Sequence, residues 1–369
     1  MEKQIAIYNT YISPLAAQKV NETLASTFIS EGKLVKEFEQ ALSSELGLIH
    51  PVALNSGTTA LHLALDLAGI GEGDEVILPA QTFVATGLVI LQQKAVPVFA
   101  DINYEDGNIS LASVRQKITA KTKAILCVHW GGYPCDMDGL HTLAKEHNLA
   151  VIEDAAHALG AFYKNKAIGS ISPYTCFSFQ AIKHLTTGDG GALAVTSQQK
   201  YTEALTKRWF GINRDTAMPT ELGERSYDIA SLGYKYHLND YGAALGLSNL
   251  QGLKERLLHR KKIARLYSER LKQLPGLQLF SYENDRESAN WLFGMHVENR
   301  LGFIRKLKEH HISASVIHQR IDRNSIFGGI KKDLVNQEKF DATQIHIPMH
   351  DAVSMEDAEY IVKTIQAGW

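Results

Sequence analysis

Short apolar segments alternate with helical patterns between residues 50 and 195 of this chain. The segments with an apolar, strand-like pattern are residues 50–54, 75–78, 96–100, 124–128, 150–154 and 192–195. The segments between them that carry apolar side chains at helical spacing include residues 61–67, 111–118 and 137–147. Strands that alternate with helices are typical of crossover connections between parallel strands. The sequence therefore predicts an α/β fold on a mixed, mostly parallel sheet flanked by helices.

Helical patterns lie on both sides of this alternating region. Residues 15–28 and 35–46 predict two amphipathic helices ahead of the first strand. One long helix is expected to run from residue 243 to residue 274, where Pro275 and Gly276 end it. This helix would lead from the alternating region into the C-terminal part of the chain.

The pattern after residue 276 indicates a second, smaller unit. A strand, a helix, a second strand and a closing helix are expected, in that order, at residues 292–297, 302–310, 313–318 and 357–365. We therefore expect a large domain over residues 1–250, which includes the N-terminal helices, and a small C-terminal α/β domain over residues 251–369.

Composition narrows the class of protein. Apolar residues make up 45% of the 369-residue chain and charged residues 21%, as in an ordinary globular protein. A formal net charge of -2 argues against a general nucleic-acid binder. Three cysteines without a CxxC pair argue against a disulfide framework or a structural zinc site, so we expect no metal. The cysteine usage, with no signal-peptide core and no apolar run of roughly 18 residues, predicts a cytoplasmic protein without a membrane partner.

Lys183 lies between an apolar strand and a glycine-rich reversal. Residues 177–179 end the strand, and residues 187–191 form the reversal ahead of the next strand. A lysine held between two such strands is poorly solvated. Desolvation lowers the pKa of an amine, and a neutral amine can attack a carbonyl. Lys183 is therefore a candidate Schiff-base lysine, and the alternative is a surface lysine in a hairpin loop.

A strand also runs into a helix through Asn55-Ser56-Gly57-Thr58-Thr59-Ala60. Gly57 allows the backbone to approach a ligand closely, and the free amides at a helix start favour an anion. The hydroxyls of Thr58 and Thr59 add donors. This junction predicts a phosphate cup, or else a plain helix cap, since Ser and Thr are the usual caps.

Two further side chains follow strands of the predicted sheet. Phe83 comes just before a helix, where its flat ring can either cover a planar ligand or belong to the core. Glu153 and Asp154 end a strand, and the carboxyl ends of parallel strands form the ligand crevice. An acid at that position can be the partner of a heterocyclic nitrogen or a structural carboxylate that caps the next turn.

The order of three motifs resembles the DegT/DnrJ/StrS family of sugar-nucleotide aminotransferases. The motifs are Ser56-Gly57-Thr58-Thr59-Ala60-Leu61, Glu153-Asp154-Ala155-Ala156-His157, and Phe177-Ser178-Phe179 followed by Lys183 and Thr186-Thr187-Gly188-Asp189-Gly190-Gly191. The resemblance covers nearly the whole chain. It implies a fold-type I, aspartate-aminotransferase-like enzyme whose cofactor is pyridoxal 5'-phosphate.

The resemblance assigns the catalytic roles to two residues. Lys183 would bond to the cofactor and later move the proton. Asp154 would be the partner of the pyridine nitrogen, because a carboxylate keeps that nitrogen protonated and lets the ring accept electrons. Related sugar 3-dehydratases carry a histidine in place of this lysine, so Lys183 favours amino transfer.

The resemblance also implies the other cofactor contacts. Gly57, Thr58 and Ser178 would bind the phosphate, and Phe83 would stack on the ring. His157 stands where the family often has Gln, near the phenolic oxygen, and it adds a titratable group. Asn239 resembles the asparagine that a neighbouring subunit sends to the phosphate. If so, the protein is a homodimer with shared active sites.

The implied reaction is a two-step, ping-pong amino transfer. L-Glutamate would be the amino donor, and the acceptor would be a nucleotide-linked 4-keto-6-deoxy or 3-keto sugar used in polysaccharide or glycan synthesis. Gln180 stands where many members have His, which leaves the acceptor open. The alternatives are a small phosphorylated ketone as acceptor, a non-catalytic regulator on the same fold, or another reaction such as decarboxylation or retro-aldol cleavage.

Candidate acceptor contacts lie in two loops. His318, Arg320 and Arg323 follow a predicted strand and suit a phosphate or pyrophosphate, although a solvated loop at a dimer surface would look the same. Arg214 and Trp209 can grip a sugar or diphosphate, or can hold the large domain together. The expected substrate-binding residues are therefore Arg214, His318 and Arg320.

Overall fold

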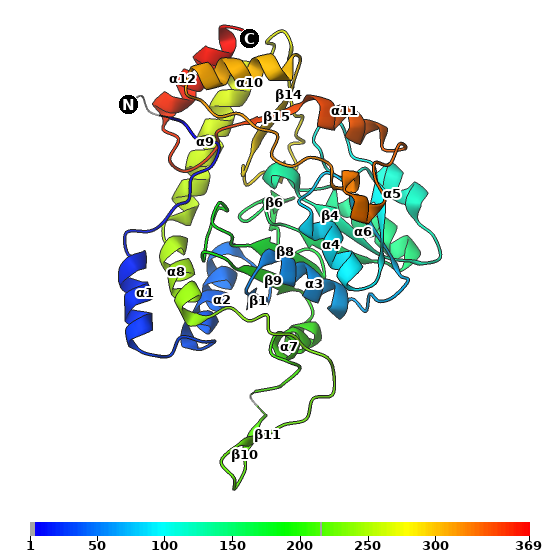
Figure 1. Ribbon diagram of the computed structural model, residues 1–369, viewed down its shortest axis with the longest axis vertical. Helices are drawn as coiled ribbons and strands as arrows, with labels where there is room; N and C mark the ends of the chain where they lie inside the picture. Colours follow the sequence, from blue (N-terminus) through cyan, green and yellow to red (C-terminus); the bar gives the residue numbers. More distant parts are fainter. Residues whose placement is uncertain (1–3, 215) are drawn as a thin grey trace.

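A seven-stranded sheet forms the centre of the computed structural model, which describes residues 4–214 and 216–369 (Figure 1). The strands, in sheet order, are β1 (Pro51–Leu54), β9 (Gly191–Val195), β8 (Tyr174–Ser178), β5 (Ala150–Asp154), β4 (Thr122–Val128), β2 (Glu75–Pro79) and β3 (Val96–Ala100). Every pair from β8 to β3 is parallel, whereas β9 is antiparallel to both of its neighbours. The predicted mixed, mostly parallel sheet is confirmed.

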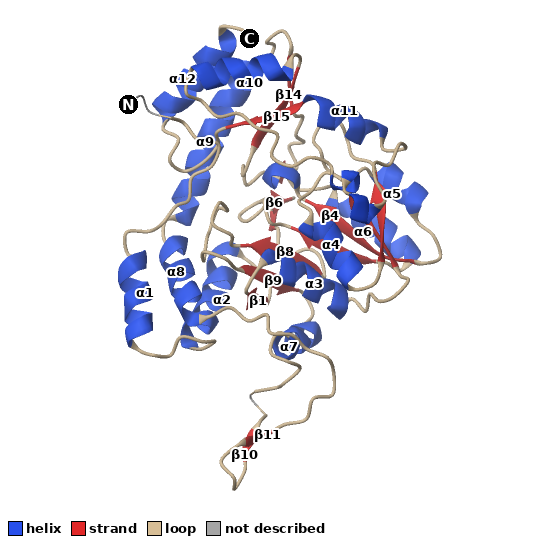
Figure 2. Cartoon of the chain, viewed as in Figure 1, coloured by secondary structure: helices blue, strands red, loops and turns tan. Residues whose placement is uncertain are grey.

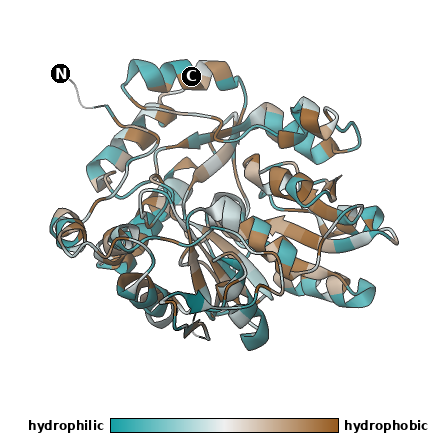
Figure 3. Cartoon of the chain, turned by 60° about the horizontal axis from the view of Figure 1, so that its bottom comes forward, coloured by the Kyte–Doolittle hydropathy of each residue, from teal (hydrophilic) through white to brown (hydrophobic). Residues whose placement is uncertain are grey.

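Helices cover both faces of this sheet (Figure 2). The helices packed on one face are α2 (Lys33–Leu46), α5 (Leu111–Lys117), α6 (Met137–His147) and α8 (Asp240–Leu250). Those packed on the other face are α3 (Gly57–Leu67), α4 (Ala85–Gln92) and α7 (Gln198–Lys207). Hydrophobic residues gather on the central strands, and hydrophilic ones on the outer faces of several helices (Figure 3). The sheet therefore carries a hydrophobic core on each side.

The single long helix expected over residues 243–274 is wrong. The structure has α8, which ends at Leu250, and a separate α9 (Leu253–Leu271). Gly252 between them has a left-handed φ of 70°, which breaks the regular helical path. The N-terminal α1 (Ala16–Ala25) lies beside α8 (Figure 1). The boundary after residue 250 falls at this break, and the division into two domains remains a proposal.

The C-terminal region surrounds a small antiparallel sheet of β12 (Leu277–Leu279), β14 (Phe293–Val297) and β15 (Gln344–Ile347). Helices α9, α10 (Arg300–Glu309) and α12 (Met355–Gln366) pack against it. The strand expected at residues 313–318 is wrong, because only Ser315 forms a bridge, with His346. The chain then turns toward the large sheet, where Ile321 N–H donates to Ala80 O at 2.9 Å.

The remaining elements connect these layers. They are β6 (Phe162–Tyr163), β7 (Lys166–Ala167), β13 (Arg286–Glu287), α11 (Val335–Thr343) and a hairpin of β10 (Met218–Pro219) and β11 (Arg225–Ser226). The hairpin forms the tip of an arm, residues 208–214 and 216–238, that projects from the body of the molecule (Figure 2). In the described ranges, no helix combines the length and apolar character that a bilayer crossing requires.

Candidate active site

A cavity of about 370 Å³ opens beside the carboxyl ends of β5 and β8. Its lining residues come from several separate elements and include Gly57, Asp154, His157, Ser178, Lys183 and His318. The structure therefore brings together residues from all three sequence motifs, together with one residue of the C-terminal loop. Such a crevice is where open α/β sheets bind their ligands.

Lys183 points its amine into this cavity from the turn after β8. The turn is closed by Lys183 N–H, which donates to Gln180 O at 2.9 Å. The Lys183 side chain is half-buried, and its Nζ lies 3.8 Å from the centroid of the Trp291 ring. Burial lowers the pKa of Lys183 to about 7, and the charge of Asp154 opposes this only in part. Lys183 is therefore not a surface lysine in a hairpin loop.

Asp154 is held by hydrogen bonds to both of its carboxylate oxygens. Thr86 Oγ1 donates to Asp154 Oδ2 at 2.8 Å, and Ala156 N–H donates to Oδ1 at 3.1 Å. Thr82 contacts Thr86 in turn, with 2.6 Å between their hydroxyl oxygens. Burial raises the pKa of Asp154 above that of an ordinary aspartate, and these hydrogen bonds and the charge of Lys183 oppose that rise only in part. The carboxylate is therefore fixed in orientation.

The start of α3 forms one end of the cavity. Ser56 caps this helix, since its Oγ accepts from Thr59 N–H at 3.1 Å. A Cβ on Gly57 would lie 2.9 Å from the Cβ of Ser178, so only glycine fits this close approach. The junction is therefore both a helix cap and a concave cup of amides and hydroxyls, to which Thr58 and Ser178 contribute side chains.

Aromatic and histidine rings form another wall of the cavity. His157 stacks on Trp291 with 3.8 Å between ring centroids and 19° between planes. Among the described residues, His157 Nδ1 has no hydrogen-bond partner although it is buried. Burial, with the nearby Lys183 charge, lowers the pKa of His157. Sequence reasoning missed Trp291, because a tryptophan at the start of a strand looks like any core residue.

Phe83 and His318 lie at the mouth of the cavity. Phe83 is 55% exposed, and its ring centroid lies 5.3 Å from that of His318. The alternative that Phe83 is a core aromatic is therefore wrong. The carbonyl of His318 accepts from the side-chain amides of Gln81 and Gln344, each at 3.1 Å. Burial, with the Lys183 charge, lowers the pKa of His318 to about 4, so His318 is neutral at pH 7.

Three residues predicted for this site lie outside the cavity lining of their own chain. Arg320 is buried, and its guanidinium binds both oxygens of Asp322 at 2.7 Å and Glu338 at 2.7 Å. The structure thus holds Arg320 in an ion-pair network, and Arg320 also lines a shallow hollow beside Phe83 and His318, so its predicted contact with the substrate remains a proposal. Asn239 caps α8 by accepting from Gly242 N–H at 2.7 Å, and Arg214 is an exposed residue of the arm itself.

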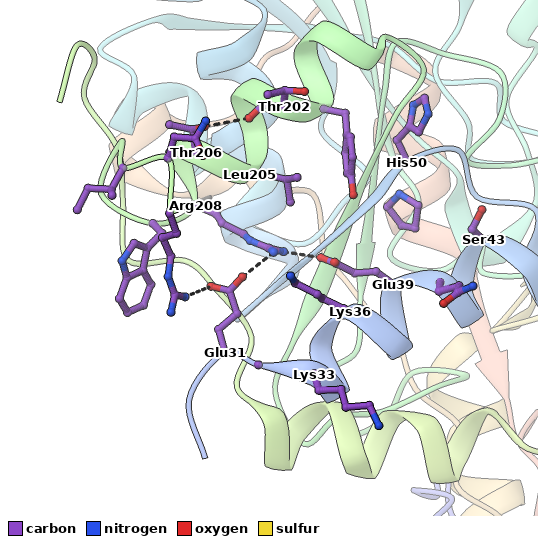
Figure 4. Close-up of a pocket in the computed structure, with 18 of the residues that line it drawn as sticks. Glu31, Lys33, Lys36, Glu39, Ser43, His50, Thr202, Leu205, Thr206 and Arg208 are labelled. Carbon is purple, nitrogen blue, oxygen red and sulfur yellow. Dashed lines mark hydrogen bonds and ion pairs between the residues drawn. The ribbon is translucent and has the colours of Figure 1, made fainter. Parts of the chain in front are cut away.

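A larger, open cleft of about 1090 Å³ lies at the base of the arm (Figure 4). Arg208 is buried there and is paired with Glu39 and, at 2.6 Å, with Glu31. Arg214 reaches the other oxygen of Glu31 at 3.3 Å, and its guanidinium lies 4.9 Å from the ring centroid of Trp209. These contacts attach the arm to Glu31 and to α2, and Arg208 also donates to Ala53 O of β1 at 3.2 Å.

Comparison with known proteins agrees with this geometry. Residues 11–366 match the family model described as the DegT/DnrJ/EryC1/StrS aminotransferase family. GDP-perosamine synthase of Escherichia coli O157:H7 is 31% identical over 373 residues, with 98% of each chain covered.

Two solved structures resemble the whole chain. The sugar aminotransferase CalS13 from Micromonospora echinospora superposes with a TM-score of 0.94 at 32% identity, covering 99% of this chain and 100% of that one. The putative sugar aminotransferase Spr1654 from Streptococcus pneumoniae, in its PLP form, gives 0.90 at 29% identity, covering 99% and 98%.

Proposed function

We propose that this chain, which belongs to the DegT/DnrJ/EryC1/StrS aminotransferase family, moves an amino group from L-glutamate to a nucleotide-linked keto-deoxysugar. It is a PLP-dependent aminotransferase. The observation that carries the proposal is Lys183: an enclosed amine with a pKa lowered to about 7 shares one cavity with a fixed carboxylate, Asp154.

The residues of the cavity fit pyridoxal 5'-phosphate. The cup at Gly57, Thr58 and Ser178 offers amides and hydroxyls to the phosphate, and a Cβ at Gly57 would fill it. The unpartnered His157 Nδ1 is a buried polar atom that a ligand can satisfy. Asp154 is the acid that would meet the pyridine nitrogen. When bound, the cofactor supplies an acceptor for the electrons released at the substrate carbon.

The chain's own residues supply the proton chemistry and the dry surroundings. At pH 7 a large fraction of the Lys183 amines is neutral, because burial has lowered the pKa. A neutral amine can bond to a carbonyl, take a proton from the donor Cα and return a proton later. Trp291 and Ile182 line the cavity, and the Trp291 ring places an apolar face against this amine, with 3.8 Å between Nζ and the ring centroid. Asp154 keeps its orientation through Thr86 and Ala156.

The acceptor is proposed from the similarity to GDP-perosamine synthase and from the shape of the cavity mouth. Phe83 and His318 flank that mouth and would contact the sugar. Arg214 and Asn239 lie outside the cavity of their own chain, so we assign them to the cavity of a second copy in a homodimer. This assignment gives the arm a role in substrate binding, through Arg214, and gives the start of α8 a role in phosphate binding, through Asn239.

The proposal is tested by incubating the holoenzyme with L-glutamate and a panel of acceptors. The panel contains GDP-, UDP- and dTDP-linked 4-keto-6-deoxy sugars, 3-keto sugars and one small phosphorylated ketone. We expect 2-oxoglutarate and an aminated nucleotide sugar, measured by mass spectrometry, and neither product with Lys183→Ala. Amination of the small phosphorylated ketone alone, or no 2-oxoglutarate with any acceptor, would contradict the proposal.

A further inference from the structure

The segment 289–292, which precedes β14, is fastened to two loops of the large sheet. On one side, Trp291 N–H and Leu292 N–H both donate to Gly131 O, at 3.0 and 3.1 Å, and Ala289 N–H donates to Gly132 O at 3.0 Å. On the other side, Ala289 O lies 2.9 Å from His184 Nε2. The segment is therefore held between the loop after β4 and the loop that carries Lys183.

Glycine makes this approach possible. Gly132 has a φ of 99°, and a Cβ built on it would lie 2.7 Å from the His157 carbonyl oxygen and 3.1 Å from Trp291 N. No other residue fits so close to that backbone. The position of Trp291 beside the cavity is thus determined by backbone packing.

The Trp291 side chain makes two contacts with the lysine loop. Its indole N–H donates to Ile182 O at 3.0 Å, which is the carbonyl of the peptide that precedes Lys183. The centroid of its ring lies 3.8 Å from Lys183 Nζ, a cation–π distance. One side chain therefore holds both the backbone and the amine of the lysine, while its ring also stacks on His157.

We propose that Trp291 is a positioning residue for Lys183. Its indole N–H fixes the Ile182–Lys183 peptide. The face of its ring contacts the lysine amine when that amine is not bonded to cofactor. The proposal rests on the assignment of Lys183 as the lysine that bonds to pyridoxal 5'-phosphate. A buried ammonium without a carboxylate partner is costly, and an aromatic face stabilises it without holding the amine as tightly as an ion pair would.

Trp130 provides a matched control. It is as buried as Trp291, at 1% against 2% exposure. Its indole Nε1 has no hydrogen-bond partner within the described residues, and it lies outside the cavity lining. Trp130→Phe and Trp291→Phe therefore make the same chemical change in buried tryptophans, but only the second removes a hydrogen bond to the lysine loop.

The test follows the rate at which cofactor-free protein bonds to added pyridoxal 5'-phosphate, by visible absorbance, as a function of pH. Trp291→Phe should slow the plateau rate roughly fivefold, the value of one hydrogen bond, whereas Trp130→Phe should leave it near the parental rate. The other titratable groups facing Lys183 are Asp154, His157, His184 and His318. They are unchanged in both variants. Equal rates in the two variants would overturn the proposal.

Labelling with fluorotryptophan distinguishes the contribution of the Trp291 ring from that of its indole N–H. Uniform 5-fluorotryptophan keeps the indole donor but weakens the attraction of the ring for a cation, so the ammonium form of Lys183 is less stabilised. The midpoint of the pH–rate curve should then move about 0.3 units to lower pH, and this shift should vanish in Trp291→Phe. A shift that persists in Trp291→Phe would contradict the claim that the Trp291 ring stabilises the Lys183 ammonium. Lys183→Ala is run in parallel, and cofactor bonding in that variant would overturn the lysine assignment and the proposal with it.

Discussion

Lys183, which is half-buried, and Arg208, which is buried, are two basic residues with opposite surroundings. Arg208 is paired with Glu31 and Glu39 and also donates to Ala53 O at 3.2 Å. Lys183 faces an aromatic ring, and within the described part of the chain no carboxylate forms an ion pair with its amine. Burial lowers the pKa of Arg208, but the charges of Glu39 and Glu31 outweigh it and raise that pKa overall, whereas the pKa of Lys183 falls to about 7.

The presence or absence of a counter-ion explains why one of these basic residues is structural and the other reactive. A buried cation with matched counter-ions stays charged and joins elements, and here Arg208 joins the arm to α2 and β1. A buried amine without such a partner can lose its proton near neutral pH and react. Counter-ions therefore offset the desolvation of Arg208, whereas the desolvation of Lys183 lowers its pKa and makes its amine reactive.

The largest effect is expected from Lys183→Ala, which removes the reactive amine. Turnover should fall by at least about a thousandfold, because Lys183 is the only lysine among the described residues that line the cavity, and the reaction needs an amine to bond to the cofactor and move the proton. Lys207 offers a control, since it is a mostly buried lysine paired with Asp66 at 2.7 Å. Lys207→Ala should keep the visible absorbance of bound cofactor, and a Lys183→Ala enzyme with normal turnover would remove Lys183 from the mechanism.

Asp154→Asn should have the next largest effect. The amide keeps the size of the side chain but cannot hold a proton on a pyridine nitrogen, so turnover should fall by about two orders of magnitude or more. Cofactor content is measured alongside, to separate weaker binding from slower chemistry. A rate within a few-fold of the parental enzyme would show that Asp154 acts only in structure.

Arg208→Met tests the paired half of the comparison. It leaves Glu39 and Glu31 without their cation, and breaking a buried ion pair typically costs about 3 kcal/mol of unfolding free energy. Chemical denaturation of the cofactor-free protein measures this loss. If Arg208 is architectural, bonding of cofactor to Lys183 in the folded fraction should be unchanged, and an altered pH midpoint for Lys183 would contradict the separation of the two sites.

Arg214→Ala should have the smallest effect on stability. The side chain is 47% exposed, and its ion pair with Glu31 at 3.3 Å lies at the edge of the open cleft. Exposed pairs of this kind contribute less than about 1 kcal/mol. Our assignment of Arg214 to the acceptor site of a second copy predicts instead a raised KM for the nucleotide sugar. An unchanged KM would return Arg214 to a purely structural role.

Much of the fold could be predicted because strands and helices alternate with clear periodicity, and the motif residues Gly57, Asp154 and Lys183 are close in sequence to strand ends. The break at Gly252 was visible only as one glycine in a helical pattern, whose conformation the sequence does not reveal. The strand at residues 313–318 was wrong because only Ser315 pairs there, with His346, before the chain turns and Ile321 N–H donates to the distant Ala80 O.

The site was harder to predict where side chains find distant partners. Arg320 looked like a free cation in the sequence. In the structure its guanidinium forms ion pairs with Asp322, two residues away, and with Glu338. Trp291 was missed because its role depends on Ile182 and Lys183, more than a hundred residues earlier. Contacts between loops, unlike periodicity, leave no pattern in a single sequence.

The central claim is that Lys183 is a buried amine that becomes neutral near pH 7. The most direct measurement is the rate of bonding between cofactor-free protein and pyridoxal 5'-phosphate across pH. The amine attacks only when neutral, so we expect the rate to fall about tenfold for each pH unit below a midpoint near 7. A rate that keeps rising to the pKa of an ordinary lysine, about 10.4, would contradict the claim.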